Sequence, residues 1–140
     1  MPILELYSKR DGIVQKKAGL NWGFSDGHVC IDDAYIAITT NFIKNNPDFF
    51  PPSGTTINVI WDDGTKMLCM VEGTQVIYNQ IFPKQLSSAY DKSIIGLYLR
   101  KRLGIPSGTQ VRMEHLNNYG RNYIEILKIG QNTYKIDFHV

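Results

Sequence analysis

The sequence has little cysteine, no long apolar run and no strong excess of charge of either sign. Its two cysteines, Cys30 and Cys69, have no CxxC spacing, so we expect buried free thiols in a reducing cytoplasm. No apolar run approaches the roughly 18 residues of a membrane span, and the N-terminus has no signal-peptide core. We therefore predict a cytoplasmic protein without membrane contacts. The net charge of +2 excludes a bulk polycation.

The familiar catalytic motifs are also missing. The histidines are solitary, and none begins the His-x-Lys-x4-Asp pattern of phospholipase-D-like nucleases. No carboxylate stands two residues before a lysine, as metal-dependent nucleases commonly require. The sequence has no HExxH motif and no glycine-rich phosphate loop of the GxxxxGK[ST] type. We predict a chain that is not an enzyme by itself, with no metal, no cofactor and no small-molecule substrate.

The distribution of turn residues is that of a mainly β protein. A chain of 140 residues is expected to form one domain, and Asp62-Asp63-Gly64 is its strongest hairpin signal. A short helix is predicted over residues 40–45 and a longer one over residues 93–103, ending at Gly104. Together these features predict an α+β barrel with roughly seven short strands. Strands are predicted over residues 3–7, 34–39, 55–61, 65–71, 76–81, 108–113, 123–129 and 133–138.

The segment from Ala18 to Gly23 has an unusual composition. Glycines surround Asn21 and Trp22, and Lys16 and Lys17 come just before them. Such a segment suits an arm held out to touch a polyanion, in which phosphate contacts position the arm and amide or ring contacts read bases. Trp22 has two interpretations, packing at the base of the arm or contact with DNA. We predict phosphate contacts for the lysines and a base contact for Asn21.

Charge is segregated along the chain, as steering toward nucleic acid requires. Acidic residues gather at 32–33 and 62–63, whereas residues 84–121 are mainly basic. We predict phosphate contacts for Arg10, Arg100 and Arg121. Arg100, Lys101 and Arg102 cannot all face one way, because neighbours on a helix lie about 100° apart. At least one of them only completes the helix end.

Several blocks together resemble the DNA-binding domain of type II restriction endonucleases, specifically the C-terminal domain that accompanies phospholipase-D-like nuclease domains. That domain is similar in turn to the plant B3-type DNA-binding domain. Asn21-Trp22-Gly23 with Tyr35-Ile36-Ala37-Ile38 is the more specific part of the match. The other blocks are Leu6-Tyr7-Ser8, Phe49-Phe50-Pro51, Trp61-Asp62-Asp63-Gly64, the run from Gly96 to Gly104, and Tyr119-Gly120-Arg121.

The resemblance implies a single domain over residues 1–140, folded as a seven-stranded B3-like pseudobarrel with one short and one longer helix. It implies sequence-specific binding of double-stranded DNA by two arms in the major groove, with a nuclease domain or subunit as partner. Phe24-Ser25 departs from the family pattern, which leaves the recognised sequence open. The N-arm residues would be Lys16, Lys17, Asn21, Trp22, Phe24, Ser25, Asp26 and His28, and the C-arm residues Gln85, Ser87, Ser88, Tyr90, Asp91 and Lys92.

Two other interpretations stay open at the level of sequence. Asp62 and Asp63 could hold a hard cation in a small metal-dependent endonuclease, although adjacent carboxylates more often decorate a hairpin turn. The chain could instead be a barrel that binds a protein or a small ligand.

Among the predicted C-arm residues, Asp91 is also the best candidate to cap the helix that begins near Ser93.

Overall fold

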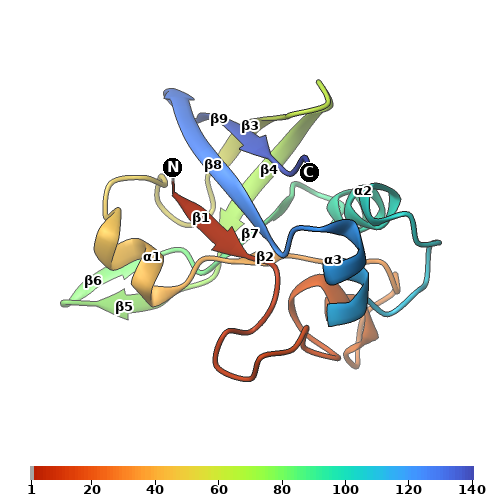
Figure 1. The fold of residues 1–140 in the computed structure, drawn as a ribbon. Coiled ribbons are helices and arrows are strands. Elements are labelled where there is room, and N and C mark those ends of the chain that lie inside the picture. The colour runs from red at the N-terminus through yellow and green to blue at the C-terminus, as the bar shows by residue number, and fades with distance from the viewer. Residues whose placement is uncertain (1) are drawn as a thin grey trace.

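The computed structural model describes residues 2–140 and contains one large sheet that curls into a nearly closed barrel (Figure 1). Its strands are β1 (Ile3–Glu5), β2 (Ile36–Ala37), β3 (Thr56–Trp61), β4 (Lys66–Glu72), β7 (Gln85–Ser88), β8 (Tyr123–Gly130) and β9 (Thr133–Asp137). Their order is β1-β8-β9-β3-β4-β7-β2, and the two edge strands, β1 and β2, contact each other. The predicted seven-stranded pseudobarrel is confirmed.

The two predicted helices form at the predicted residues. In α1 (Thr40–Asn45) the Thr39 hydroxyl accepts a hydrogen bond from the Phe42 amide at 3.1 Å, which caps the first turn. Helix α2 (Ser93–Leu103) ends at Gly104, whose φ of 72° is left-handed. The structure adds a third helix, α3 (Met113–Tyr119), and a 3-10 helix, η1 (Gly19–Phe24), neither of which was predicted.

Two predicted strands are wrong. Residues 76–81 form a two-stranded hairpin, β5 (Gln75–Ile77) and β6 (Gln80–Phe82), because Tyr78 and Asn79 take positive φ angles of 51° and 64° and turn the chain between them. Residues 108–112 are not in a strand, and Met113 already begins α3. There the His115 ring accepts a hydrogen bond from the Arg112 amide at 2.9 Å, which caps the start of the helix.

The interior of the barrel is filled by alternating residues of the strands, such as Ile57, Val59 and Trp61 of β3. Phe50 is buried and Phe49 packs against the same core. Both cysteines are free thiols; Cys69 is buried, which raises its pKa to about 12, whereas Cys30 is only half-buried. Within residues 2–140, every helix is too short or too polar to cross a membrane.

Candidate nucleic-acid interface

The glycine-rich segment predicted as a free arm is packed against the domain instead. Its η1 turn buries Leu20 and Asn21. The Asn21 side-chain amide donates to the carbonyls of Gln15 and Val111, both at 2.8 Å, and its oxygen accepts from the Val111 amide at 2.7 Å. Because all of these groups are used internally, Asn21 is not available to read a base. The predicted DNA contact of Asn21 is corrected to a structural role.

Glycine and aromatic residues in this segment also have packing roles. A Cβ atom on Gly23 would lie 2.2 Å from the Ile31 carbonyl oxygen, so this glycine permits a close backbone approach. The Trp22 ring packs edge-on against His28 at 4.5 Å and Tyr35 at 5.2 Å, which supports the packing interpretation of Trp22. Three other predicted N-arm residues differ in exposure: Phe24 and Ser25 are half-buried, and Asp26 is exposed.

The predicted C-arm, residues 85–92, is not an arm. Residues 85–88 form β7, which is paired with β4 on one side and β2 on the other. Ser87 and Ser88 are buried, and the Ser88 hydroxyl accepts a hydrogen bond from the Ile95 amide at 3.0 Å. These two serines therefore belong to the barrel wall and cannot touch DNA. Gln85 is half-buried and sits in the same strand.

The end of that segment joins β7 to α2. The Asp91 carboxylate accepts hydrogen bonds from the Ser93 hydroxyl at 2.6 Å and the Ser93 amide at 3.0 Å, as expected of a cap, and these bonds lower the pKa of Asp91. Lys92 pairs with Glu72 at 2.5 Å. Tyr90 is the one strongly exposed apolar side chain of the segment. It points to solvent beside the barrel wall rather than from an arm.

Two of the three arginines predicted to contact phosphate are buried. The Arg100 side chain is buried beside Asp32, with Nε 3.3 Å from the carboxylate. Arg121 is buried too, and pairs with Glu125 at 2.5 Å. Arg10 differs from both, because 86% of its side chain is exposed. The phosphate contacts predicted for Arg100 and Arg121 are corrected to internal ion pairs.

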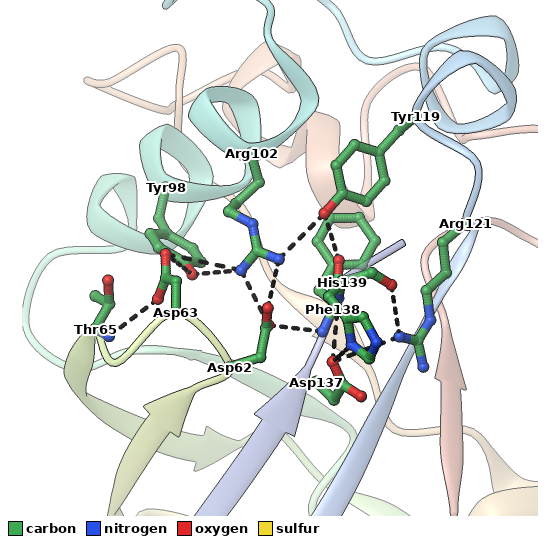
Figure 2. Close-up of polar contacts among 10 residues, drawn as sticks. All are labelled: Asp62, Asp63, Thr65, Tyr98, Arg102, Tyr119, Arg121, Asp137, Phe138 and His139. Atoms are coloured by element: carbon green, nitrogen blue, oxygen red, sulfur yellow. Dashed lines mark hydrogen bonds and ion pairs between the residues drawn. The ribbon is translucent and has the colours of Figure 1, made fainter.

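Asp62 and Asp63 take part in a polar network at the end of β3 (Figure 2). Asp62 accepts two hydrogen bonds from the Arg102 guanidinium, at 3.0 and 2.8 Å, and a third from the Phe138 amide at 2.8 Å. Although burial alone lowers the pKa of Arg102, its hydrogen bonds to Asp62 and to two tyrosines raise it above its usual value. Arg102 is thereby held as a cation against the carboxylate.

The same region contains the group of potential metal ligands Asp62, Asp137 and His139, whose ligand atoms lie within 4.8 Å of one another. Arg102 contacts Asp62 at 2.8 Å and Arg121 lies 3.6 Å from Asp137. A divalent cation would have to compete with both guanidinium groups. Asp62 and Asp137 are therefore already ion-paired, and the network gives no support to the metal-dependent endonuclease.

A cleft of about 820 Å³ lies on another side of the barrel, between segments that the sequence places far apart. One wall is the basic loop, residues 8–17, which Ser8 and Ile13 close with a short β-bridge. Edge strand β2 and the first turn of α1 form the floor, and Gln75 contributes the base of the β5–β6 hairpin. In Figure 1 the loop after β1 lies below the barrel and the hairpin projects to the lower left.

The basic loop carries exposed cations beside this cleft. Lys9 and Arg10 form its tip, and Lys16 and Lys17 stand exposed at its end. Within the described residues, the loop's own acidic group is Asp11, whose carboxylate lies 3.5 Å from Arg10. The loop therefore carries four basic side chains against one acid, a balance that suits contact with phosphates.

Sequence reasoning missed the hairpin and the polar residues at the start of α1. Thr40 and Asn41 are exposed and line the cleft. Tyr78 is 81% exposed at the hairpin tip, and the Lys44 ammonium lies 5.5 Å from the centre of its ring. The signal for this turn is weak at the level of sequence, because Tyr-Asn lacks the glycine that usually marks a two-residue hairpin loop.

Comparison with known proteins agrees with the barrel fold. No curated protein matches the chain. The family described as NgoFVII C-terminal B3-like DNA-binding domain matches residues 3–130, which include every strand of the barrel except β9. From the barrel topology and this match, the chain belongs to the B3-like DNA-binding domains of the NgoFVII restriction enzyme family.

Proposed function

We propose that this domain binds a specific sequence of double-stranded DNA through the major groove, using the basic loop and the β5–β6 hairpin as its two arms. The observation that carries the proposal is that one cleft is lined by residues of the basic loop and by Gln75 at the base of the hairpin. The floor between them is polar and exposed at Thr40 and Asn41. A major groove about 12 Å wide admits a two-stranded ribbon such as this hairpin.

The base of the hairpin is fixed to the barrel, as an arm that reads bases requires. The Gln75 amide donates to the carbonyls of Ile38 and Pro83, both at 2.8 Å, and its oxygen accepts from the Thr40 hydroxyl at 3.2 Å. Gln75 thereby ties β5 to the end of β2 and to α1. A pre-positioned arm loses less conformational freedom on binding than a flexible one.

The biological context that fits this domain is restriction of DNA. In this proposal the domain supplies target recognition, and another domain or subunit supplies the nuclease. The support is the family match together with the ion-paired state of the Asp62 region. A third role, as a protein- or ligand-binding barrel, predicts no salt-dependent affinity for DNA.

The direct test is selection of bound duplexes from a randomised DNA pool at moderate salt without Mg²⁺. We expect enrichment of one short motif. Binding without enrichment would mean that a basic surface binds DNA without sequence preference. Absence of binding would favour the protein- or ligand-binding barrel. Adding Mg²⁺ to the enriched duplex separates recognition from cleavage, and we expect no cleavage by this chain.

The basic loop should contribute the salt-dependent part of the affinity. Changing Lys16 and Lys17 to glutamine is expected to weaken DNA binding, because the loop then neutralises fewer phosphates. The slope of log affinity against log salt should become shallower by about 0.9 for each phosphate that is no longer neutralised. The slope is measured by titrating a labelled duplex between low and moderate salt.

The matched control changes Lys128 and Lys135 to glutamine. These exposed lysines carry the same charge but stand on β8 and β9, away from the cleft. We expect them to leave the slope nearly unchanged. Equal losses of affinity from both pairs would mean that net charge, and not the loop, governs binding.

A substitution at the hairpin tip is expected to change stability and DNA binding in opposite directions. Tyr78 holds a φ of 51°, which costs a bulky side chain free energy. Replacing Tyr78-Asn79 by Asn-Gly, the preferred pair for such a turn, should raise the free energy of unfolding by about 1 kcal/mol. The same change should weaken binding to the selected duplex, since it removes the exposed ring. Thermal unfolding and titration of one protein preparation give both values, and tighter or unchanged DNA binding would contradict the arm role of the tip.

A further inference from the structure

The β5–β6 hairpin has two unlike faces. Gln75 and Phe82 pair across the strands and turn toward the barrel, where Gln75 is hydrogen-bonded and Phe82 packs on the core. Ile77 shares that face and is buried. Val76 and Ile81 pair on the opposite face, where 67% and 70% of their surfaces are exposed.

This exposed pair is not explained by the fold. Single exposed apolar residues are common on proteins. Here two large aliphatic side chains stand directly opposite each other on a projecting ribbon, and their strand neighbours already supply the contacts that hold the hairpin in place. The hairpin meets the cleft at Gln75, which precedes Val76 in β5, whereas Val76 and Ile81 lie on the opposite, exposed face of the ribbon.

The exposed face of the hairpin, which carries Val76 and Ile81, is the face that can contact a DNA groove. If the hairpin enters the major groove, the side toward the barrel is already occupied, so Val76 and Ile81 are presented to the base edges. The apolar group that the major groove offers is the C5-methyl of thymine, since the other edge positions are hydrogen-bond donors and acceptors. A methylated cytosine carries a methyl at the same ring position.

We propose that Val76 and Ile81 form a methyl-reading patch that contacts the C5-methyl group of a pyrimidine in the bound DNA. The patch rests on the proposed function, because it requires the hairpin to lie in the major groove. Each methyl group removed from water adds about four-fold to the affinity. A domain with this patch favours sites that place thymine or 5-methylcytosine opposite the hairpin.

The first measurement compares duplexes that differ only in methyl groups. Each thymine of the selected duplex is replaced in turn by deoxyuracil, which removes the methyl and keeps the pairing edge. In a second arm, each cytosine is replaced by 5-methylcytosine. We expect at least one position at which the methyl group strengthens binding about four-fold or more, and the arm in which it appears identifies its source.

The second measurement assigns that effect to the patch. In the variant Val76→Ser with Ile81→Ser, the ratio of affinities for the methylated and methyl-free duplexes should fall toward one, whatever the change in affinity for the methyl-free duplex. The ratio is internal to each protein, so a loss of stability does not imitate the result. Ile129→Ser is the matched control, because this exposed isoleucine lies on β8 away from the cleft, and its ratio should be unchanged.

The outcomes separate the patch from the proposed function. A sequence-selective domain without any methyl effect, or with a methyl effect that survives in the double variant, overturns the patch and leaves the two-arm proposal standing. Absence of DNA binding overturns both. Loss of the methyl effect in the double variant alone establishes the patch.

Discussion

Replacing Asp32 by alanine is expected to lower the free energy of unfolding by about 3 to 5 kcal/mol, the usual result of leaving a buried charge without its partner. The Asp32 carboxylate lies 3.3 Å from Nε of Arg100, and both side chains are buried. It also accepts hydrogen bonds from the Ser107 hydroxyl at 2.5 Å and the Gly108 amide at 2.7 Å. The alanine variant leaves the Ser107 and Gly108 donors without their acceptor and Arg100 without its counter-ion. Urea unfolding followed by tryptophan fluorescence measures the loss of stability.

The arginine in this pair explains why the loss is large. Burial lowers the pKa of Arg100 and the Asp32 charge opposes that shift. Its guanidinium donates hydrogen bonds to three backbone carbonyls, from Nε to Thr109, from Nη1 to Gly96 and from Nη2 to Leu20. Arg100 therefore joins η1, α2 and the loop before α3, and it remains a cation when Asp32 is removed.

Two further variants test this assignment. Asp33→Ala removes the neighbouring carboxylate, which is half-buried and pairs with His28 at 2.9 Å, and it should cost less than Asp32→Ala. Combining Asp32→Ala with Arg100→Met should destabilise by less than the sum of the single changes, because no unpaired charge remains. Full additivity, or a loss below about 1 kcal/mol for Asp32→Ala, would contradict a coupled buried pair.

The parts of the fold that sequence reasoning predicted are those fixed by local signals. The turn at Asp62-Asp63-Gly64 joins β3 to β4 as expected, with Gly64 at a φ of 87°. The bounds of α1 and α2 agree because Thr39 and Gly104 determine where these helices begin and end. Such signals act within a few residues, so they can be read without tertiary structure.

The site was predicted less well, because contacts between segments far apart in sequence decide which of its residues are buried and which are exposed. Ser87 and Ser88 have the composition of a recognition loop, yet pairing with β4 and β2 places them in the barrel wall. Arg100 looks like the other cations at the end of α2, but its partner Asp32 lies far away in sequence. The β5–β6 hairpin was not predicted because residues 76–81 read as one continuous strand. The phosphate contacts of Lys16, Lys17 and Arg10 stay predictions, and these side chains are exposed beside the cleft as that role requires.

The second large effect is expected at Asn21. Changing Asn21 to alanine should lower the free energy of unfolding by about 3 kcal/mol, since buried backbone groups left without partners cost about 1 to 3 kcal/mol each. The affected groups are the carbonyl of Gln15 and both the carbonyl and the amide of Val111, a residue 90 positions later in the sequence. Thermal unfolding of the variant and the unchanged protein gives the difference.

The matched control is Asn41→Ala, which removes the same side chain from an exposed position that lines the cleft. Its effect on stability should stay within about 0.5 kcal/mol, whereas it should weaken binding to the selected duplex. Asn21→Ala should show the reverse, with DNA affinity retained at temperatures where the variant is fully folded. An Asn21 variant of normal stability that no longer binds DNA would return this residue to the interface. Loss of stability in one variant and loss of DNA binding in the other would distinguish an asparagine that holds the basic loop in place from one that touches DNA.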